Sequence, residues 1–293
     1  MKQPLSSHVR AHDGAADMRR SALVALCERE PSAKAAAAGA LLAQYRAGEI
    51  SCQVDETIEG PVGLPGRPDR PTLVEPRSLR HRGMQTEAGR AVLVHALAHI
   101  EFNAINLALD AVWRFAGMPE AYYADWLQVA AEEAHHFGLL QARLHDFGHA
   151  YGDFPAHNGL WDMCERTRDD VLARMALVPR TLEARGLDAS PPIRARLQQA
   201  GDAQSAAILD VILRDEIGHV RIGNRWFRYL CELRDLAPHE TYARLAAQHR
   251  APRLRGPFNF DARRDAGFDE DELAALIAQS PAAAAGAEDG AWR

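Results

Sequence analysis

Glutamate and histidine side chains spaced three residues apart are the groups in this chain best suited to bind metal ions. The sequence contains Glu-x-x-His at Glu132/His135, Glu133/His136 and Glu216/His219. Residues three apart lie on one face of an α-helix, so both side chains of such a pair can reach the same ion.

The residues that flank these three motifs show which of them lie on an apolar helix face. Positions three, four and seven away from Glu133 are apolar apart from His136, and the same pattern surrounds Glu216 with His219. The pair that begins at Glu132 lies on a more polar face. We therefore expect the pairs Glu133/His136 and Glu216/His219 to face the core and to bind metal.

Two further glutamates are candidates for the same site. Glu101 lies in the middle of an apolar helical stripe, "HALAHIEFNAINLALDA", and burial of an unpaired charge is costly. Glu183, in "ALVPRTLEARG", is similar but lies close to the expected end of its helix. Glu165 and Asp169 are the alternatives to Glu183.

The candidate ligands form two similar halves, each a helix with one glutamate followed by a helix with Glu-x-x-His. The interval from Glu101 to Glu133 nearly equals that from Glu183 to Glu216. Four carboxylates and two imidazoles in a helical bundle predict a two-metal site. Oxygen and imidazole ligands suit iron or manganese and, less specifically, zinc. We expect two iron ions, with iron plus manganese, manganese or zinc as alternatives.

An acidic residue precedes each core-facing glutamate. Ligand histidines usually donate their second ring N–H to a carboxylate. We therefore predict that Asp215 holds His136 and that Glu132 holds His219. His135 is expected to be solvated or outside the set of ligands.

The elements that position these residues are predicted to be helices throughout. A 3.6-residue apolar period or helix-forming composition covers most of the chain, and strand signals are almost absent. The expected helices are 18–29, 33–47, 87–115, 119–147, 160–185 with a kink at Pro179, 193–199, 202–233, 238–250 and 269–279. Pairs with short links and one longer connection predict a four-helix bundle with a crossover.

The predicted organisation has five parts. They are an N-terminal helical extension (1–58), a Pro/Gly/Arg-rich wrapping linker (59–86), the bundle (87–235), a C-terminal helical elaboration (236–279) and a flexible tail (280–293). Leu64, Leu73 and Val74 are the expected apolar anchors of the linker. Because Glu216 lies deep in its helix, we expect the third bundle helix to be interrupted at Gly186–Pro192 and then to continue.

Composition narrows the class of protein. The net charge is −6 without a prominent basic block, which makes nucleic acid an unlikely partner. No apolar run approaches the ~20 residues of a membrane-spanning helix, and the N-terminus has no hydrophobic signal core. The four cysteines form no CxxC pair. We expect a cytoplasmic protein with reduced thiols.

Several blocks of the sequence resemble a known family. They are "AHIEFNAINLALDA", "EEAHHFGLL", "YGDFPAHNGLWD", "VPRTLEARGLD" and "RDEIGHVRIGNRWF". They resemble the ferritin-like family called domain of unknown function 455, over roughly residues 60–275. The resemblance implies a ferritin-like four-helix bundle with a dinuclear metal centre, and no particular substrate. More distantly, the pattern is similar to diiron hydroxylases, including the tRNA-modifying one, and to rubrerythrins.

The expected function is an O2- or peroxide-dependent oxidoreductase acting on an unidentified small substrate. Electrons would come from an external donor, since no flavin, NAD or iron–sulfur signature is present. The alternatives are a metal-handling ferroxidase or peroxide scavenger, and a non-catalytic bundle that retains a metal site. A homodimer is possible in each case.

Overall fold

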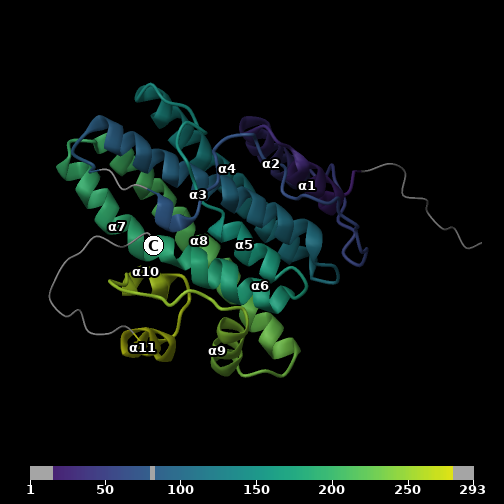
Figure 1. The fold of residues 1–293 in the computed structure, drawn as a ribbon. Helices are drawn as coiled ribbons and strands as arrows, with labels where there is room; N and C mark the ends of the chain where they lie inside the picture. Colours follow the sequence, from purple (N-terminus) through teal and green to yellow (C-terminus); the bar gives the residue numbers. More distant parts are fainter. Residues whose placement is uncertain (1–15, 80–82, 280–293) are drawn as a thin grey trace, which may run out of the picture.

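The computed structural model describes residues 16–79 and 83–279, and these residues form an all-α protein (Figure 1). Within them, β-structure is limited to two isolated bridges, Asp17 with Ser51 and Leu73 with Ala156. The all-α prediction is confirmed. The predicted flexible tail and most of the N-terminal segment before Met18 lie outside the described residues.

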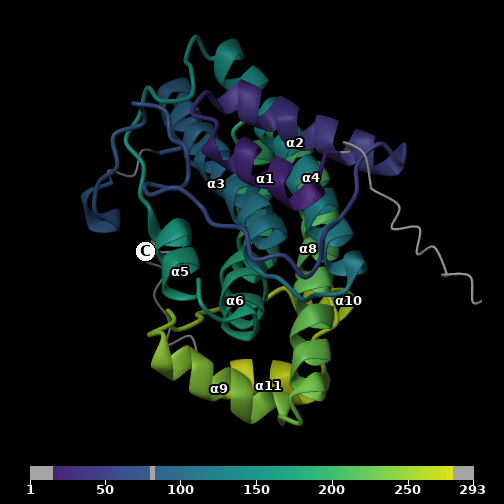
Figure 2. The same cartoon turned by 90° about the vertical axis from the view of Figure 1, so that its right-hand side faces the viewer.

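The N-terminal extension contains the two predicted helices, α1 (Met18–Cys27) and α2 (Pro31–Arg46). Asp17 caps α1 by accepting a hydrogen bond from the Arg20 N–H, and Glu30 caps α2, which begins at a proline. Both helices pack on the outside of the next helix pair (Figure 2).

The described residues of the expected linker, 59–79 and 83–86, are mostly irregular, with one short 3-10 turn, η1 (Pro76–Ser78). The Val74 N–H donates to the Ala156 carbonyl (2.8 Å), and the Ala156 N–H donates to Thr72 (3.1 Å), which ties the linker to the crossover loop. Leu64 packs on the core, whereas Leu73 is exposed. The anchor prediction is therefore right for Leu64 and wrong for Leu73.

Four long helices form two pairs that contain the site. They are α3 (Glu87–Arg114), α4 (Glu120–Asp146), α7 (Ala184–Gln199) and α8 (Ala203–Leu233). Short connections make α3 and α4 antiparallel neighbours, and likewise α7 and α8. Contacts between α4 and α8 join the pairs (Figure 1).

The single helix predicted for residues 160–185 is wrong. The chain instead forms α5 (Gly159–Arg166), α6 (Val171–Leu177) and a π-helical segment, η2 (Val178–Glu183), which runs directly into α7. Asp170 caps α6 by accepting from the Leu172 N–H, and Pro179 lies inside η2. A proline lacks the N–H that an α-helical turn needs, which favours the wider turn at this point.

The predicted interruption at Gly186–Pro192 is also wrong, because α7 passes through it without a break. Pro191 has no N–H for the carbonyl of Leu187, but the side-chain amide of Asn259 donates to that carbonyl instead (3.2 Å). The 16 residues of α7 span roughly 24 Å at about 1.5 Å per residue. This length lets α7 reach from Glu183 along α8 past Glu216.

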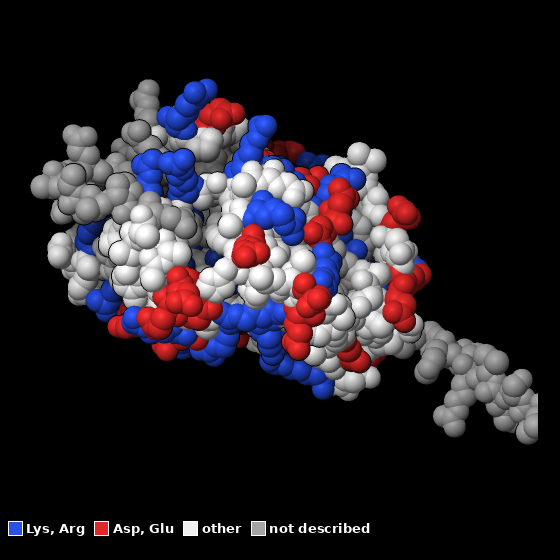
Figure 3. Space-filling view, turned by 90° about the horizontal axis from the view of Figure 1, so that it is seen from below, with Lys and Arg blue, Asp and Glu red and all other residues white. Residues whose placement is uncertain are grey.

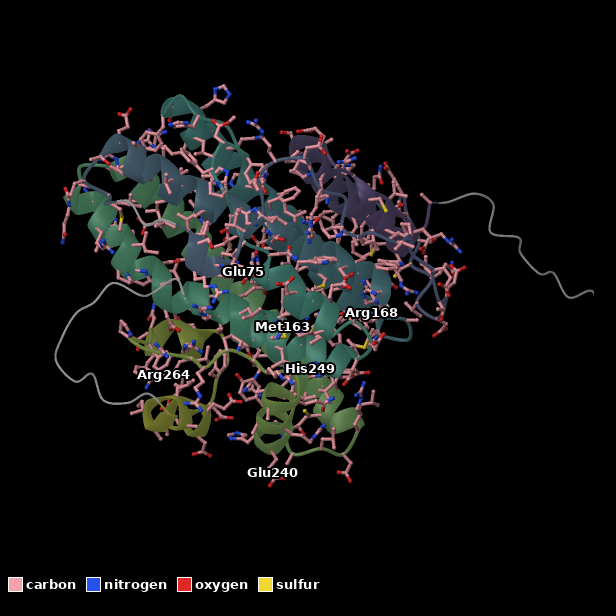
Figure 4. All side chains as sticks on the ribbon, viewed as in Figure 1. Glu75, Met163, Arg168, Glu240, His249 and Arg264 are labelled. Atoms are coloured by element: carbon pink, nitrogen blue, oxygen red, sulfur yellow. The ribbon has the colours of Figure 1, made fainter. Side chains whose placement is uncertain are left out.

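The C-terminal elaboration lies on one side of α7 and α8. It comprises α9 (Pro238–Gln248), α10 (Phe260–Asp265) and α11 (Glu270–Gln279), of which α10 was not predicted. Seen from this side, basic and acidic residues alternate without a large patch of one sign (Figure 3). Figure 4 labels Glu240 of α9 and Arg264 of α10 on this C-terminal elaboration.

Among the described residues, α3 is the one helix long and apolar enough to cross a membrane by length and composition alone. However, 78% of its most apolar window is buried inside the protein. A core helix of a soluble protein shows the same pattern, so α3 is weak evidence for a membrane.

Candidate metal centre

The first group of ligand atoms comes from α3 and α4. Nδ1 of His136 lies 3.3 Å from Oε2 of Glu101 and 3.4 Å from Oε2 of Glu133. All three side chains are buried. Two atoms that bind one metal at about 2.1 Å lie roughly 3 Å apart, so these separations suit a shared ion.

The second group comes from α8 and again includes Glu133. Nδ1 of His219 lies 2.9 Å from Oε1 of Glu133 and 3.8 Å from Oε2 of Glu216. The two oxygens of Glu133 therefore face different histidines. The structure brings together five of the six predicted ligands as two overlapping clusters joined by Glu133.

Glu183, the sixth predicted ligand, is the last residue of η2 and is also buried. This segment packs on α8, the helix that contributes Glu216 and His219, but the Glu183 carboxylate is not a member of either cluster. The alternatives Glu165 and Asp169 belong to neither cluster: their side chains are 43% and 90% exposed and both pair with Arg168.

Each candidate ligand histidine is held on its far side by a carboxylate. Nε2 of His136 lies 3.1 Å from Asp215, and Nε2 of His219 lies 2.8 Å from Glu132. Both predicted contacts are confirmed. They leave Nδ1 of each ring directed at the cluster of glutamates. His135, in contrast, is exposed.

Burial sets the protonation of three carboxyl groups. It raises the pKa of Glu101 to about 8 and that of Glu183 to about 8, and in both cases the charge of Glu133 adds to the shift. Burial, followed by repulsion from Glu133, also raises the pKa of Glu216 well above its ordinary value. Without a cation, these groups therefore hold protons near neutral pH.

Glu133 and the two histidines shift in the opposite sense. Burial opposes charge on His136, but the close carboxylates of Glu101 and Glu133 outweigh it and raise its pKa to about 12. The same balance raises the pKa of His219 well above its ordinary value. For Glu133, burial favours the neutral form, but the histidine charges lower its pKa overall. Positive charge is thus stabilised around Glu133.

Several polar atoms in the cluster make no well-directed hydrogen bond within the described residues. They are Oε2 of Glu101, Oε1 of Glu133, Oε2 of Glu183, Oε2 of Glu216 and Nδ1 of His219. Buried polar atoms in folded proteins almost always have a partner, so such a concentration in one place needs an explanation. Electron-pair donors that converge without partners fit a bound cation.

Comparison with known proteins places the chain in a family. The sequence model of the family described as "Protein of unknown function (DUF455)" matches residues 27–274. The chain belongs to this family. An uncharacterized protein of Haemophilus influenzae is 48% identical over 213 residues, which cover 70% of this chain and 74% of that protein. No solved structure matches the chain.

The match to the family includes every residue of the two metal clusters and also a polar cluster that the sequence did not reveal. His95 and His99 are buried on the side of α3 away from Glu101. Nδ1 of His99 lies 2.9 Å from the Tyr151 hydroxyl, and the Gly152 N–H donates to His95 (2.9 Å). The crossover loop thus packs on the face of α3 that contains these histidines. Their i, i+4 spacing was the available signal.

Proposed function

We propose that this protein is a ferritin-like dinuclear metal protein and an O2- or peroxide-dependent oxidoreductase. The observation that carries the proposal is the sharing of Glu133 between two buried clusters, each with one histidine, whose donor atoms lack partners. A bridging carboxylate between two Glu-x-x-His halves is the ligand arrangement of ferritin-like carboxylate proteins.

The residues present fit two such ions. Glu101 and His136 would hold one, Glu216, His219 and Glu183 the other, and Glu133 both. When bound, two iron ions would supply the redox chemistry that activates O2 or peroxide. Iron with manganese, manganese and zinc also suit these ligands, so the metal must be measured.

The side chains around the ligands fix their orientation and keep water out. Asp215 and Glu132 hold the two imidazole rings so that Nδ1 of each remains available to a cation. Apolar neighbours on the same stripes, such as Val129, Ala130 and Ile212, are buried. Low local polarity strengthens every charge interaction inside the cluster.

The decisive experiment is metal analysis of protein purified without added metal, followed by anaerobic reduction and exposure to O2. About two iron ions per chain and a transient absorption band would support the proposal. Stoichiometric zinc alone, with no reaction with O2, would overturn it. The substrate and the electron donor have to be found by separate screens.

A metal-handling role, as a ferroxidase or peroxide scavenger, is the second candidate. Two surface clefts, of about 750 Å³ and 390 Å³, are lined by residues such as Tyr151 and His145, and Arg225 and Tyr229, respectively. Neither contains a candidate ligand in its lining. This favours small reactants at the metals over a bulky organic substrate. Iron uptake followed by oxidation without added organic substrate would support this role.

A further inference from the structure

Arg180 is a buried arginine in η2, three residues before Glu183. Its guanidinium group donates to Oδ1 of Asn224 on α8 (2.9 Å) and to Glu272 on α11. The same group lies over three aromatic rings from the surrounding elements, those of Phe227, Tyr242 and Phe268. The π-helical segment is therefore attached through one side chain to α8, α9 and α11.

Glu272 is itself held in the first turn of α11. Its carboxylate accepts the Asp269 N–H (3.0 Å), while the Glu272 N–H donates to the Asp269 side chain (2.9 Å). This reciprocal pair is a capping box. Arg228 also donates to Glu272 (3.2 Å). Although His239, Asp269 and Glu272 lie close enough to hold an ion, these contacts already use the Glu272 carboxylate.

Two other contacts hold η2 in its wide-turn conformation. Oγ1 of Thr181 donates to the Ala176 carbonyl (2.7 Å) and meets the Tyr242 hydroxyl of α9 (3.0 Å). A Cβ atom at Gly223 would lie 2.5 Å from Cβ of Pro179, so the backbone of α8 packs directly against the proline ring of η2. Both α8 and the C-terminal elaboration thus support the segment that ends at Glu183.

We propose that α9–α11 form a clamp that positions Glu183, and that Arg180 is the positioning residue through which it acts. A π-turn contains one residue more than an α-turn. Relaxation of η2 to an α-helix would rotate Glu183 by about 100° and direct its carboxylate away from the cluster. The contacts of Arg180 with Glu272 and Asn224 oppose that rotation. This inference rests on the proposed two-metal site.

The clamp acts on one half of the site. Glu183 ends η2, which packs on α8, the helix of Glu216 and His219, whereas Glu101 and His136 reach the cluster from α3 and α4. No contact of Arg180 or Glu272 described above reaches those two helices. Loss of the clamp therefore weakens the ion on the His219 side and leaves the other ion bound.

The test is titration of the full-length, metal-free protein with Co²⁺, read by absorption and by metal content. At a concentration that fills both positions of the unaltered protein, Arg180→Lys and Glu272→Gln should hold one Co²⁺. Their second ion should bind at least tenfold more weakly. Asp269→Ala removes the cap of α11 and the contact of Asp269 with His239 but leaves Arg180 and Glu272 in place, so it should weaken the second ion less than the other two variants.

The matched control is Arg19→Met. Arg19 is equally buried and ties the N-terminal extension to α3 by donating to the Trp113 carbonyl (2.8 Å). This variant should lower the unfolding temperature and still bind two Co²⁺. Folded clamp variants that bind two ions normally, or lose both equally, would overturn the inference. Failure of the unaltered protein to bind two ions would instead refute the proposed metal centre.

Discussion

The two buried polar faces of α3 differ in how their side chains are satisfied. On the face toward α4 and α8, Glu101 has an oxygen without a hydrogen-bond partner and lies among other unpartnered donors. On the other face, the buried polar residues each make at least one hydrogen bond within the fold, although Nδ1 of His95 has no partner among the described residues. These residues are His95, His99, Asn103, Asn106 and Asp110.

The second face is a network built for stability. Asp110 accepts hydrogen bonds from Arg114 and pairs with the buried Arg174. Asn106 accepts from the ammonium group of Lys34 on α2, which also donates to the carbonyl of Gly66 (2.7 Å). Buried groups that have partners fix the packing, whereas convergent groups without partners fit the proposed metal centre. Under this proposal, one face of α3 uses buried charge for stability and the other uses it for binding.

The largest expected effect of any substitution is at Glu133, the residue common to both clusters. Glu133→Gln keeps the size of the side chain but removes the carboxylate that faces both histidines. We expect binding of both metal ions to be lost while the helical circular dichroism is retained. Equilibrium dialysis with Co²⁺ measures the effect. A folded variant that still binds two ions would remove the distinction between the two faces of α3.

At Asp110, on the face of α3 away from Glu101, we expect a substitution to lower stability and to leave metal binding unchanged. Asp110→Ala leaves the buried guanidinium of Arg174 without its carboxylate, a change that typically costs about 3–5 kcal/mol. We expect the urea midpoint to fall by a corresponding amount. Metal content measured while the variant is still folded should remain at two ions. Loss of metal without loss of stability would show that the network serves the site.

The sequence was sufficient to place the candidate ligands on buried helix faces, because helical periodicity assigns residues to faces and an ionisable group on an apolar stripe is conspicuous. The pairing of Asp215 with His136 followed from spacing and the needs of an imidazole ligand. The positions of α3, α4 and α8 followed from the same periodicity.

The course of the chain between residues 160 and 199 could not be predicted in this way. The carbonyl freed by Pro191 is satisfied by Asn259, which is distant in the sequence, and η2 is supported by Arg180 and Glu272. Periodicity and proline content contain no information about such partners. For the same reason the partners of His95 and His99, which come from the crossover loop, were not predicted.

Asp215 gives an effect of intermediate size, since it acts on the metal through His136. Asp215→Asn retains a hydrogen-bonding group but loses the charge that favours the correct ring orientation. We expect metal affinity to fall by about 10–100-fold. Arg214→Ala, at the exposed partner of Asp215, is the control and should bind metal almost normally. Equal affinities in the aspartate variant and the unaltered protein would count against its role.

The pH should act in opposite directions on metal binding and on metal-free stability. Glu101 and Glu183 have pKa values raised from 4.5 to about 8, so metal must displace their protons. Affinity for Co²⁺ should therefore rise between about pH 6 and pH 8, by up to about tenfold per unit for each proton released.

The metal-free protein should instead become less stable as the pH rises from 4.5 toward 8. Over that range the folded carboxyl groups keep protons that the unfolded chain has released, so unfolding is increasingly favoured. Urea midpoints of metal-free protein across this range measure the slope. A slope of the opposite sign would mean that these carboxyl groups are ionised in the folded protein.

The smallest effect on stability and metal binding is expected for substitution of His135. Comparing it with His136 contrasts an exposed and a buried position on α4, as the two faces of α3 were contrasted above. His135 is exposed, whereas His136 is fully buried against Glu133. His135→Ala should change stability by less than about 0.5 kcal/mol and leave two ions bound. His136→Ala should lose the ion held with Glu101. Because the two histidines differ by one position, or about 100° around the helix, equal losses of metal in both variants would show that α4 faces the cluster in a different register.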